Sequence, residues 1–335
     1  MKSTYNTEIY IEKNAESFIK ELFNGEVQII VTPSSLKSVE NLIGDSRKIY
    51  LTKDYKLELI KPDTKSIIGV GGGTAIDIAK YFASISKKRL IVIPTVLSTN
   101  AFATSKTCTR KITQKTLDSK MPDQVIIDLE IIKRANPRYN IAGAGDILSI
   151  YTANYDWKLH NKENFNNFNK DVYDYTTSGV ALSLLDTIKK CSQQIKENSL
   201  DGLKTLAELL IFSGYVTSMY GNGRPESGSE HLFVNVVESE IKKDFLHGEL
   251  VSLGTIIMSY LQDNDPSYIT KIIDSLGLSR SLTQIGITRE ETIESLYKAK
   301  SVRKDRYTIL QKLDLSKKDL ENTLEKLLQE GLIKI

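Results

Sequence analysis

The sequence contains few of the residues that build small disulfide-linked or metal-clustered domains. Among its 335 residues there are two cysteines, Cys108 and Cys191, which lie far apart and have no paired spacing. This scarcity excludes a disulfide framework and a zinc ribbon, and we expect both thiols to be reduced. The only histidines are His160, His231 and His247, so a metal site built on imidazole has few candidate ligands.

Long apolar runs and a strong excess of one charge are also missing. No apolar stretch approaches the ~20 residues of a membrane-crossing helix, and the N-terminal segment MKSTYNTEIYIEKNAE lacks the apolar core of a signal peptide. We therefore expect a cytoplasmic protein without a membrane partner. The net charge of +3 is too small to favour nucleic-acid binding, so the expected partner is a small-molecule substrate. We also expect a homo-oligomer.

Hydrophobic residues make up 40% of the chain and are spread along its length, which predicts two folded domains. Up to about residue 130, β-rich runs alternate with helical stretches, as in a doubly wound, Rossmann-like α/β domain with a parallel sheet. The predicted strands are Val27 to Thr32, Lys48 to Thr52, Ser66 to Val70, Leu90 to Pro94 and Gln124 to Asp128. From about Ile141 the apolar spacing becomes helical. We predict an α/β domain at 1–140 and an all-α domain at 141–335.

One predicted strand leads through Gly71, Gly72 and Gly73 into an amphipathic helix. Glycines at such a turn let the backbone approach a pyrophosphate, whose charge the helix N-terminus binds. The run is neither GxGxxG nor a P-loop, so a tight turn that needs glycine only for packing remains an alternative. Asp77 and Lys80, three residues apart on the predicted helix, are by themselves typical of a surface ion pair.

Three ionisable residues, Asp146, His231 and His247, lie near predicted helix starts. Two imidazoles and one carboxylate from different helix ends suit a catalytic divalent ion with one open coordination position. Taken singly, each is better explained as a satisfied core histidine or an N-cap aspartate. His160 lies ~21 Å along its predicted helix from Asp146 and is interpreted as a polar cap instead of a ligand.

Longer segments resemble the sn-glycerol-1-phosphate dehydrogenase family, within the superfamily of iron-containing alcohol dehydrogenases, glycerol dehydrogenase and dehydroquinate synthase. The matching segments are GVGGGTAIDIAK (69–80), IPT (93–95), AGAGDILSIYTANYDWKL (142–159), GRPESGSEHLF (223–233), HGELVSLGTIIMSYL (247–261) and DRYTIL (305–310). The resemblance implies a dehydroquinate synthase-like fold with an NAD(P)-binding N-terminal domain. It also implies Zn²⁺, or Fe²⁺ or Ni²⁺, on Asp146, His231 and His247, which are then the catalytic residues.

The resemblance further implies which residues contact the cofactor. Two turns at the carboxyl ends of predicted strands match the family, and an open α/β sheet binds its ligands at these ends. The expected cofactor contacts are Gly71, Gly72, Gly73, Thr74, Asp77, Thr95, Ser98 and Thr104.

The chain departs from the family pattern where the substrate is expected. Asn100 stands where the family has aspartate, and Asn235 where it repeats histidine four residues after the first metal histidine. An amide holds no charge at neutral pH, so we expect both residues to face the substrate and dihydroxyacetone phosphate to be reduced poorly. The expected substrate contacts are Asn100, Asp146, Asn235 and Arg224. For a substrate phosphate, Arg303 and Arg306 are further candidates, although each arginine is equally typical of an ion pair.

These features favour a metal-dependent NAD(P) oxidoreductase that interconverts a small ketone or aldehyde, possibly phosphorylated, with its alcohol. The first alternative is a lyase of the dehydroquinate synthase type that uses NAD transiently. Those relatives usually have glutamate at the position of Asp146, so this aspartate favours the dehydrogenase. The second alternative, a non-catalytic nucleotide-binding protein, explains Asn100 and Asn235 as decay but leaves the three metal ligands unexplained.

Overall fold

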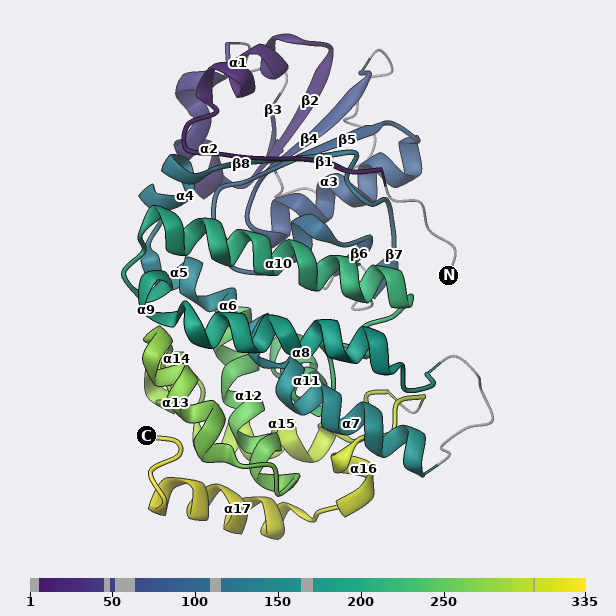
Figure 1. Cartoon of the computed structure of the whole chain (residues 1–335), viewed down its shortest axis with the longest axis vertical. Coiled ribbons are helices and arrows are strands. Elements are labelled where there is room, and N and C mark those ends of the chain that lie inside the picture. Colours follow the sequence, from purple (N-terminus) through teal and green to yellow (C-terminus); the bar gives the residue numbers. More distant parts are fainter. Residues whose placement is uncertain (1–5, 45–48, 52–63, 109–115, 164–170, 304) are drawn as a thin grey trace. The chain divides into compact units, whose positions relative to one another are not determined.

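The computed structural model describes residues 6–44, 49–51, 64–108, 116–163, 171–303 and 305–335 (Figure 1). The chain forms two compact units. Unit 1 consists of Met1–Asn140 with Glu197–Met219, and unit 2 consists of Ile141–Lys196 with Tyr220–Ile335. The first change of unit falls at the expected residue 140. Residues 197–219, however, belong to the first unit, although their helical pattern placed them in the C-terminal domain.

Unit 1 contains a six-stranded sheet in which every neighbouring pair is parallel. Its spatial order is β1 (Glu8–Glu12), β8 (Gln124–Asp128), β5 (Arg89–Pro94), β4 (Ser66–Gly71), β2 (Val27–Val31) and β3 (Ile49–Leu51). The predicted doubly wound sheet is therefore confirmed. Strand β1 escaped prediction because it is an edge strand with the half-exposed sequence EIYIE. The outer residues of the predicted strand Lys48 to Thr52 lie outside the described residues.

Helices cover both faces of this sheet (Figure 1). On one face, alternate strand residues pack in a single apolar cluster against α1 (Glu16–Asn24), α2 (Pro33–Val39) and α4 (Leu129–Arg134). Gly69 points the other way, toward α3 (Gly73–Ser86), and a Cβ built on it would lie 2.6 Å from the Cβ of Ala79. This glycine lets α3 lie directly on β4, which fixes where the helix begins.

Shorter elements complete the N-terminal part of unit 1. They are the 3₁₀ turns η1 (Glu40–Leu42) and η4 (Ala101–Ala103), and the antiparallel pair β6 (Lys106–Cys108) and β7 (Thr116–Asp118).

The long helix α10 (Leu200–Tyr220) joins unit 1 through a close backbone approach. A Cβ on Gly214 would overlap the carbonyl group of Ala103 in η4. One residue earlier, the Oγ of Ser213 lies 3.4 Å from the Nδ2 of Asn100. Gly214 thus permits a contact that joins this helix to the first unit.

Unit 2 is helical, as expected. Besides α5 (Pro137–Ala142), which begins in unit 1, its helices are α6 (Ala144–Leu148), α7 (Ile150–Lys162), α8 (Tyr175–Lys190), α9 (Ser192–Lys196), α11 (Ser229–Glu240), α12 (His247–Leu261), α13 (Pro266–Leu276), α14 (Leu282–Ile285), α15 (Arg289–Ala299), α16 (Ile309–Leu313) and α17 (Lys317–Gln329).

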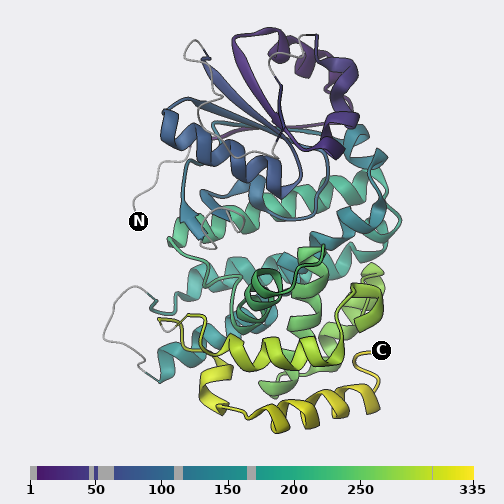
Figure 2. The same cartoon turned by 180° about the vertical axis from the view of Figure 1, so that it is seen from behind.

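Helix α12 is the centre of unit 2, because its residues from Gly248 to Ser259 are all buried. It packs against α6, α7, α11 and α13. Further out, α15 lies against α11 and α17 against α15 (Figure 2). Among the described residues, no helix is both long and apolar enough to cross a membrane.

Candidate active site

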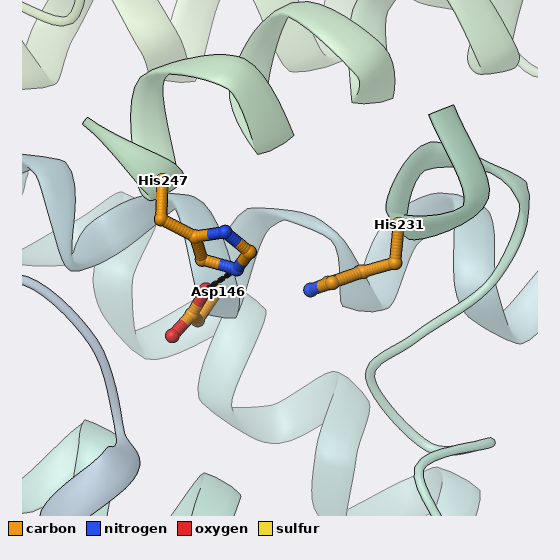
Figure 3. A group of neighbouring side chains, drawn as sticks. All are labelled: Asp146, His231 and His247. Carbon is orange, nitrogen blue, oxygen red and sulfur yellow. Dashed lines mark ion pairs between the residues drawn. The ribbon is translucent and has the colours of Figure 1, made fainter. Parts of the chain in front are cut away.

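Asp146, His231 and His247 lie together in unit 2 although they are far apart in the sequence (Figure 3). Each comes from the first turn of a different helix, namely α6, α11 and α12. One ligand atom from each residue lies within 4.8 Å of the other two, and Asp146 Oδ1 is 3.6 Å from His247 Nε2. Two bonds of about 2.0 to 2.2 Å to one ion span at most about 4.4 Å, so the 3.6 Å pair fits one ion as it stands, and a separation of 4.8 Å needs to close by only a few tenths of an ångström.

Two glycines beside the ligands explain how α6 and α12 come so close. A Cβ on Gly145 would overlap the backbone of Gly248, and a Cβ on Gly248 would overlap the carbonyl of Ala142. The chain neighbours of these glycines are Asp146 and His247. The backbones therefore cross at the site itself, and the AGAG segment at 142–145 supplies the contact that pairs two candidate ligands.

The first turn of α11 is fixed by buried polar contacts from α7. Both the backbone N–H and the hydroxyl of Ser229 donate hydrogen bonds to Asp156 Oδ2, at 2.7 and 2.6 Å. The Ile309 N–H donates to the other carboxylate oxygen of Asp156. Gly228 occupies the N-cap position of α11, and Ser229 is the first helical residue. These bonds hold His231 at a defined place on unit 2.

Each candidate ligand histidine contacts a glutamate through its Nδ1 atom. His231 Nδ1 lies 2.9 Å from Glu230 Oε1, and His247 Nδ1 lies 3.0 Å from Glu238 Oε1. These contacts leave Nε2 of both rings for an ion. Figure 3 shows the His247 ring reaching Asp146 and the His231 ring directed toward the same point.

Two buried carboxyl groups behind His231 differ in their acidity. Burial raises the pKa of Asp156 to about 6, with a further contribution from the nearby charge of Glu230. Burial also tends to raise the pKa of Glu230, but hydrogen bonds from His231, Gly228 and Thr152 outweigh it and leave this pKa below its usual value. Glu230 is therefore an ionised carboxylate in the interior of unit 2.

The glycine turn in unit 1 presents an uncapped helix N-terminus. Gly72 is the N-cap residue of α3, and no side chain of the described residues caps it. The first N–H groups of a helix have no partner within the helix, so they are available to an anion. A Cβ on Gly72 would lie 3.2 Å from Val96, and one on Gly73 would lie 3.1 Å from Thr99. Larger residues at this turn would therefore displace the 95–99 loop.

The expected cofactor residues around this turn differ in exposure. Thr74 is exposed and Ser98 is half-buried, while Thr95 and Thr104 are buried. The Thr95 N–H donates to the carbonyl of Gly71, which joins the ends of β4 and β5. Thr104 donates to the Lys106 carbonyl. Thr74 and Ser98 are thus the side chains that remain open to a ligand, and Thr104 holds its own loop.

Asp77 and Lys80 form a buried pair that holds the segment after β5. The ammonium group of Lys80, fully buried, lies 2.8 Å from Asp77 Oδ1 and donates to the carbonyls of Ala101 and Lys106. The other oxygen of Asp77 accepts a hydrogen bond from the Cys108 N–H. These contacts correct one sequence interpretation, because the pair is buried instead of lying on the surface. Asp77 supports the loop, and its expected contact with the cofactor stays a prediction.

The two asparagines that depart from the family pattern have different surroundings. Asn100 is 9% exposed, at the start of η4, and its amide faces Ser213. Asn235 is half-buried, and its side chain has no hydrogen bond to any described residue. It follows His231 by four positions on α11, so both lie on the same face of the helix. Asn235 is therefore placed beside the candidate metal ligands, within unit 2.

The arginines expected to bind a substrate phosphate have partners within unit 2. Arg224 is fully buried, and its guanidinium contacts Asp171, His160 and the carbonyl of Tyr307. The donors of Arg224 thus already serve the interior of unit 2, and its expected substrate contact stays a prediction. His160, expected as a polar cap, is its buried partner, and burial lowers the pKa of this imidazole.

The other two arginines are also engaged. Arg303 forms an exposed ion pair with Asp305. Arg306 is buried and donates to the carbonyl and hydroxyl of Ser227, and burial lowers its pKa to about 10. The charge of Arg306 lies close enough to Glu230 to interact with it. Arg306 thus compensates the buried carboxylate behind His231.

The sequence analysis missed the contacts that Glu230 and Glu238 make with His231 and His247. Glu230 and Glu238 carry no motif of their own, and their relevance follows only from their contacts with the two histidines. The signal for Glu230 was its position directly before His231, and Glu238 had none.

Comparison with known proteins begins with a match to a family model described as iron-containing alcohol dehydrogenase, over residues 19–136. A glycerol-1-phosphate dehydrogenase of Sulfolobus acidocaldarius is 37% identical over 89% of this chain and 80% of its own length. The enzyme of the same name from Pyrococcus furiosus is 32% identical over 92% of this chain and 84% of its own.

Solved structures resemble the whole chain. Glycerol dehydrogenase from Schizosaccharomyces pombe superimposes with a TM-score of 0.74 at 21% identity, covering 99% of this chain and 93% of that protein. Sulfoacetaldehyde reductase from Bifidobacterium kashiwanohense, solved in complex with NAD⁺, gives a TM-score of 0.70 at 15% identity, covering 97% and 98%. At these identities the likeness concerns the fold, and it confirms the architecture expected from the sequence.

Proposed function

Because this chain belongs to the iron-containing alcohol dehydrogenases, and among them to the glycerol-1-phosphate dehydrogenase family, we propose that it is a metal-dependent NAD(P) oxidoreductase acting on a small phosphorylated ketone and its alcohol. The substrate of the named relatives implies dihydroxyacetone phosphate or a close analogue. The observation on which the proposal depends is the convergence of Asp146, His231 and His247 within 4.8 Å.

The donor set fits a divalent ion. One carboxylate and two imidazoles that direct Nε2 toward the same point are typical ligands of a catalytic zinc site that keeps a position open. We propose Zn²⁺, with Fe²⁺ or Ni²⁺ as alternatives that the same donors accept. When bound, the ion supplies a Lewis acid for the substrate oxygen and the nicotinamide supplies the hydride.

The protein residues supply binding and orientation. The N–H groups at the start of α3 bind the pyrophosphate, and Gly72 and Gly73 allow its approach. Asp146, His231 and His247 would hold the ion through one carboxylate oxygen and two imidazole nitrogens. Asn235, half-buried beside His231 and without a protein partner among the described residues, donates and accepts hydrogen bonds with substrate hydroxyl groups.

The test is to reconstitute the chelator-treated protein with Zn²⁺ and to follow NADH and NADPH oxidation with dihydroxyacetone phosphate, small ketones, aldehydes and their phosphates. We expect turnover with a phosphorylated ketone that is lost after chelation and in His247→Ala. Dinucleotide binding should persist in His247→Ala, because that residue lies outside the α3 turn. Release of inorganic phosphate without net NADH oxidation would instead identify the lyase chemistry.

A further inference from the structure

Two glutamates stand directly behind the two histidines of the candidate metal centre. Glu230 Oε1 accepts from His231 Nδ1 at 2.9 Å, and Glu238 Oε1 accepts from His247 Nδ1 at 3.0 Å. Neither glutamate belongs to the group of Asp146, His231 and His247. The same arrangement on both rings is a separate feature of the site, since each histidine could be held by a backbone carbonyl or by water instead.

The two glutamates reach their histidines from one helix, α11, by different routes. Glu230 is adjacent to His231, and its fully buried carboxylate also accepts from the Thr152 hydroxyl at 2.7 Å and from the Gly228 N–H. Glu238 lies two turns further along α11 and reaches across to the first residue of α12. One contact therefore ties the site to α7, and the other ties α11 to α12.

A carboxylate at Nδ1 decides which ring nitrogen holds the proton. With Nδ1–H donating to glutamate, the lone pair of Nε2 is free for an ion, and the ring cannot rotate without breaking the bond. The carboxylate also makes the imidazole a stronger donor. The two contacts therefore prepare both rings to bind a cation through Nε2.

We propose that Glu230 and Glu238 are positioning residues that fix both imidazoles in the Nδ1–H tautomer and raise the affinity of the site for a divalent cation. This proposal rests on the metal site proposed above. Glu238 is the decisive residue, because its side chain keeps 11% of its surface exposed and joins two helices, whereas that of Glu230 is 0% exposed. We expect its replacement to leave α11 otherwise intact. Glu230 also supports the interior, so its loss would affect folding as well as metal binding.

The experiment measures Zn²⁺ affinity by competition with a chromophoric chelator in wild type, Glu238→Ala, Glu238→Gln and Glu240→Gln. Glu240 is the matched control, since it ends the same helix and pairs on the surface with Lys298 at 2.6 Å. We expect Glu238→Ala to bind Zn²⁺ about 10 to 100 times more weakly than wild type. Glu238→Gln should lose less, because its amide oxygen still accepts from Nδ1–H, and Glu240→Gln should match wild type.

Two further measurements distinguish the proposed positioning role of Glu238 from a purely structural role. The visible absorption spectrum of the Co²⁺-loaded protein should change in Glu238→Ala and not in Glu240→Gln, whereas the melting temperature of the metal-free proteins should be the same. If wild type binds Zn²⁺ and Glu238→Ala binds it equally well, the positioning role is wrong while the metal site stands. If wild type itself binds no divalent ion, the proposed function is overturned together with this inference.

Discussion

At the scale of single residues, the site depends on small side chains as much as on charged ones. Asp146 and His247 meet because their neighbours Gly145 and Gly248 have no Cβ. The two backbones cross so closely there that a Cβ would not fit between them. The sequence pointed to Asp146, His231 and His247 as three helix-start residues, and the structure places them together. The sequence did not show that the backbones of α6 and α12 cross so closely, because a glycine next to a ligand residue is equally typical of a turn.

Asn235 gives a residue-scale prediction about substrate choice. Replacing it with histidine restores a titratable group beside His231, so Asn235→His should raise kcat/KM for dihydroxyacetone phosphate. Asn100→Asp should have a smaller effect, because Asn100 is 9% exposed and its amide faces Ser213. Steady-state kinetics of the two single variants and the double variant measure this. Should the natural protein already equal the double variant, these asparagines do not mark altered specificity.

Asp156 gives a prediction about pH. Its ordinary pKa of 3.8 is raised to about 6 in the folded protein, so the folded state holds this proton more tightly than the unfolded state. The contribution of Asp156 is therefore fully present below pH 3.8 and is lost as the pH rises to about 6. We expect urea unfolding of the two chelator-treated proteins, wild type and Asp156→Asn, to show this loss. As the pH rises from 3.8 to about 6, the free energy of unfolding of wild type should fall relative to that of Asp156→Asn. A pH-independent difference would mean that Asp156 has an ordinary pKa.

At the scale of elements, the prediction from sequence was best for strands that are apolar on both faces. The runs that became β2, β4, β5 and β8 were found because almost every residue in them is buried. Strand β1 has a solvent-exposed face and reads as an ordinary polar segment. Lys80 was misread for a related reason, since the sequence does not show that the carbonyls of Ala101 and Lys106 surround its ammonium group.

The turn between β4 and α3 gives an element-scale prediction. Gly72→Val should weaken NAD(P) binding by at least about tenfold, because a Cβ at this position already lies 3.2 Å from Val96 and the branched side chain fills the approach to the helix N-terminus. Cofactor affinity is measured by fluorescence titration. Gly179→Val is the matched control, since a Cβ there meets no atom within 4 Å. If Gly72→Val folds and binds NAD(P) with unchanged affinity, the pyrophosphate does not bind at this turn.

At the scale of the whole molecule, the two proposed ligands belong to different units. The proposed metal ligands lie in unit 2, on α6, α11 and α12, and the turn proposed to bind the pyrophosphate lies in unit 1. The sequence predicted two domains from the change in periodicity near residue 140, which is where the chain first changes unit. The sequence did not predict that residues 197–219 belong to unit 1. Helical periodicity shows that one face of a helix is buried, but it does not show which part of the protein packs against that face.

This division predicts where each ligand stabilises the protein. Zn²⁺ at 100 times its dissociation constant should add about 2.7 kcal/mol to the stability of the elements that it joins. Hydrogen exchange should then slow in α6, α11 and α12, whereas NADH should slow exchange in β4, β5 and α3. Peptides from α17 serve as an internal reference. Equal protection of both groups of peptides by Zn²⁺ alone would place the ion elsewhere.

Helix α10 has a consequence for how the protein is made. Ser213 and Gly214 complete unit 1 against Asn100 and Ala103, yet a ribosome synthesises them only after residues 141–196, which belong to the other unit. Unit 1 therefore cannot finish folding during synthesis until residues 141–196 of unit 2 have been made. A chain that ends at residue 140 is therefore not a complete domain. It lacks α10, the helix that packs against the loop of Asn100.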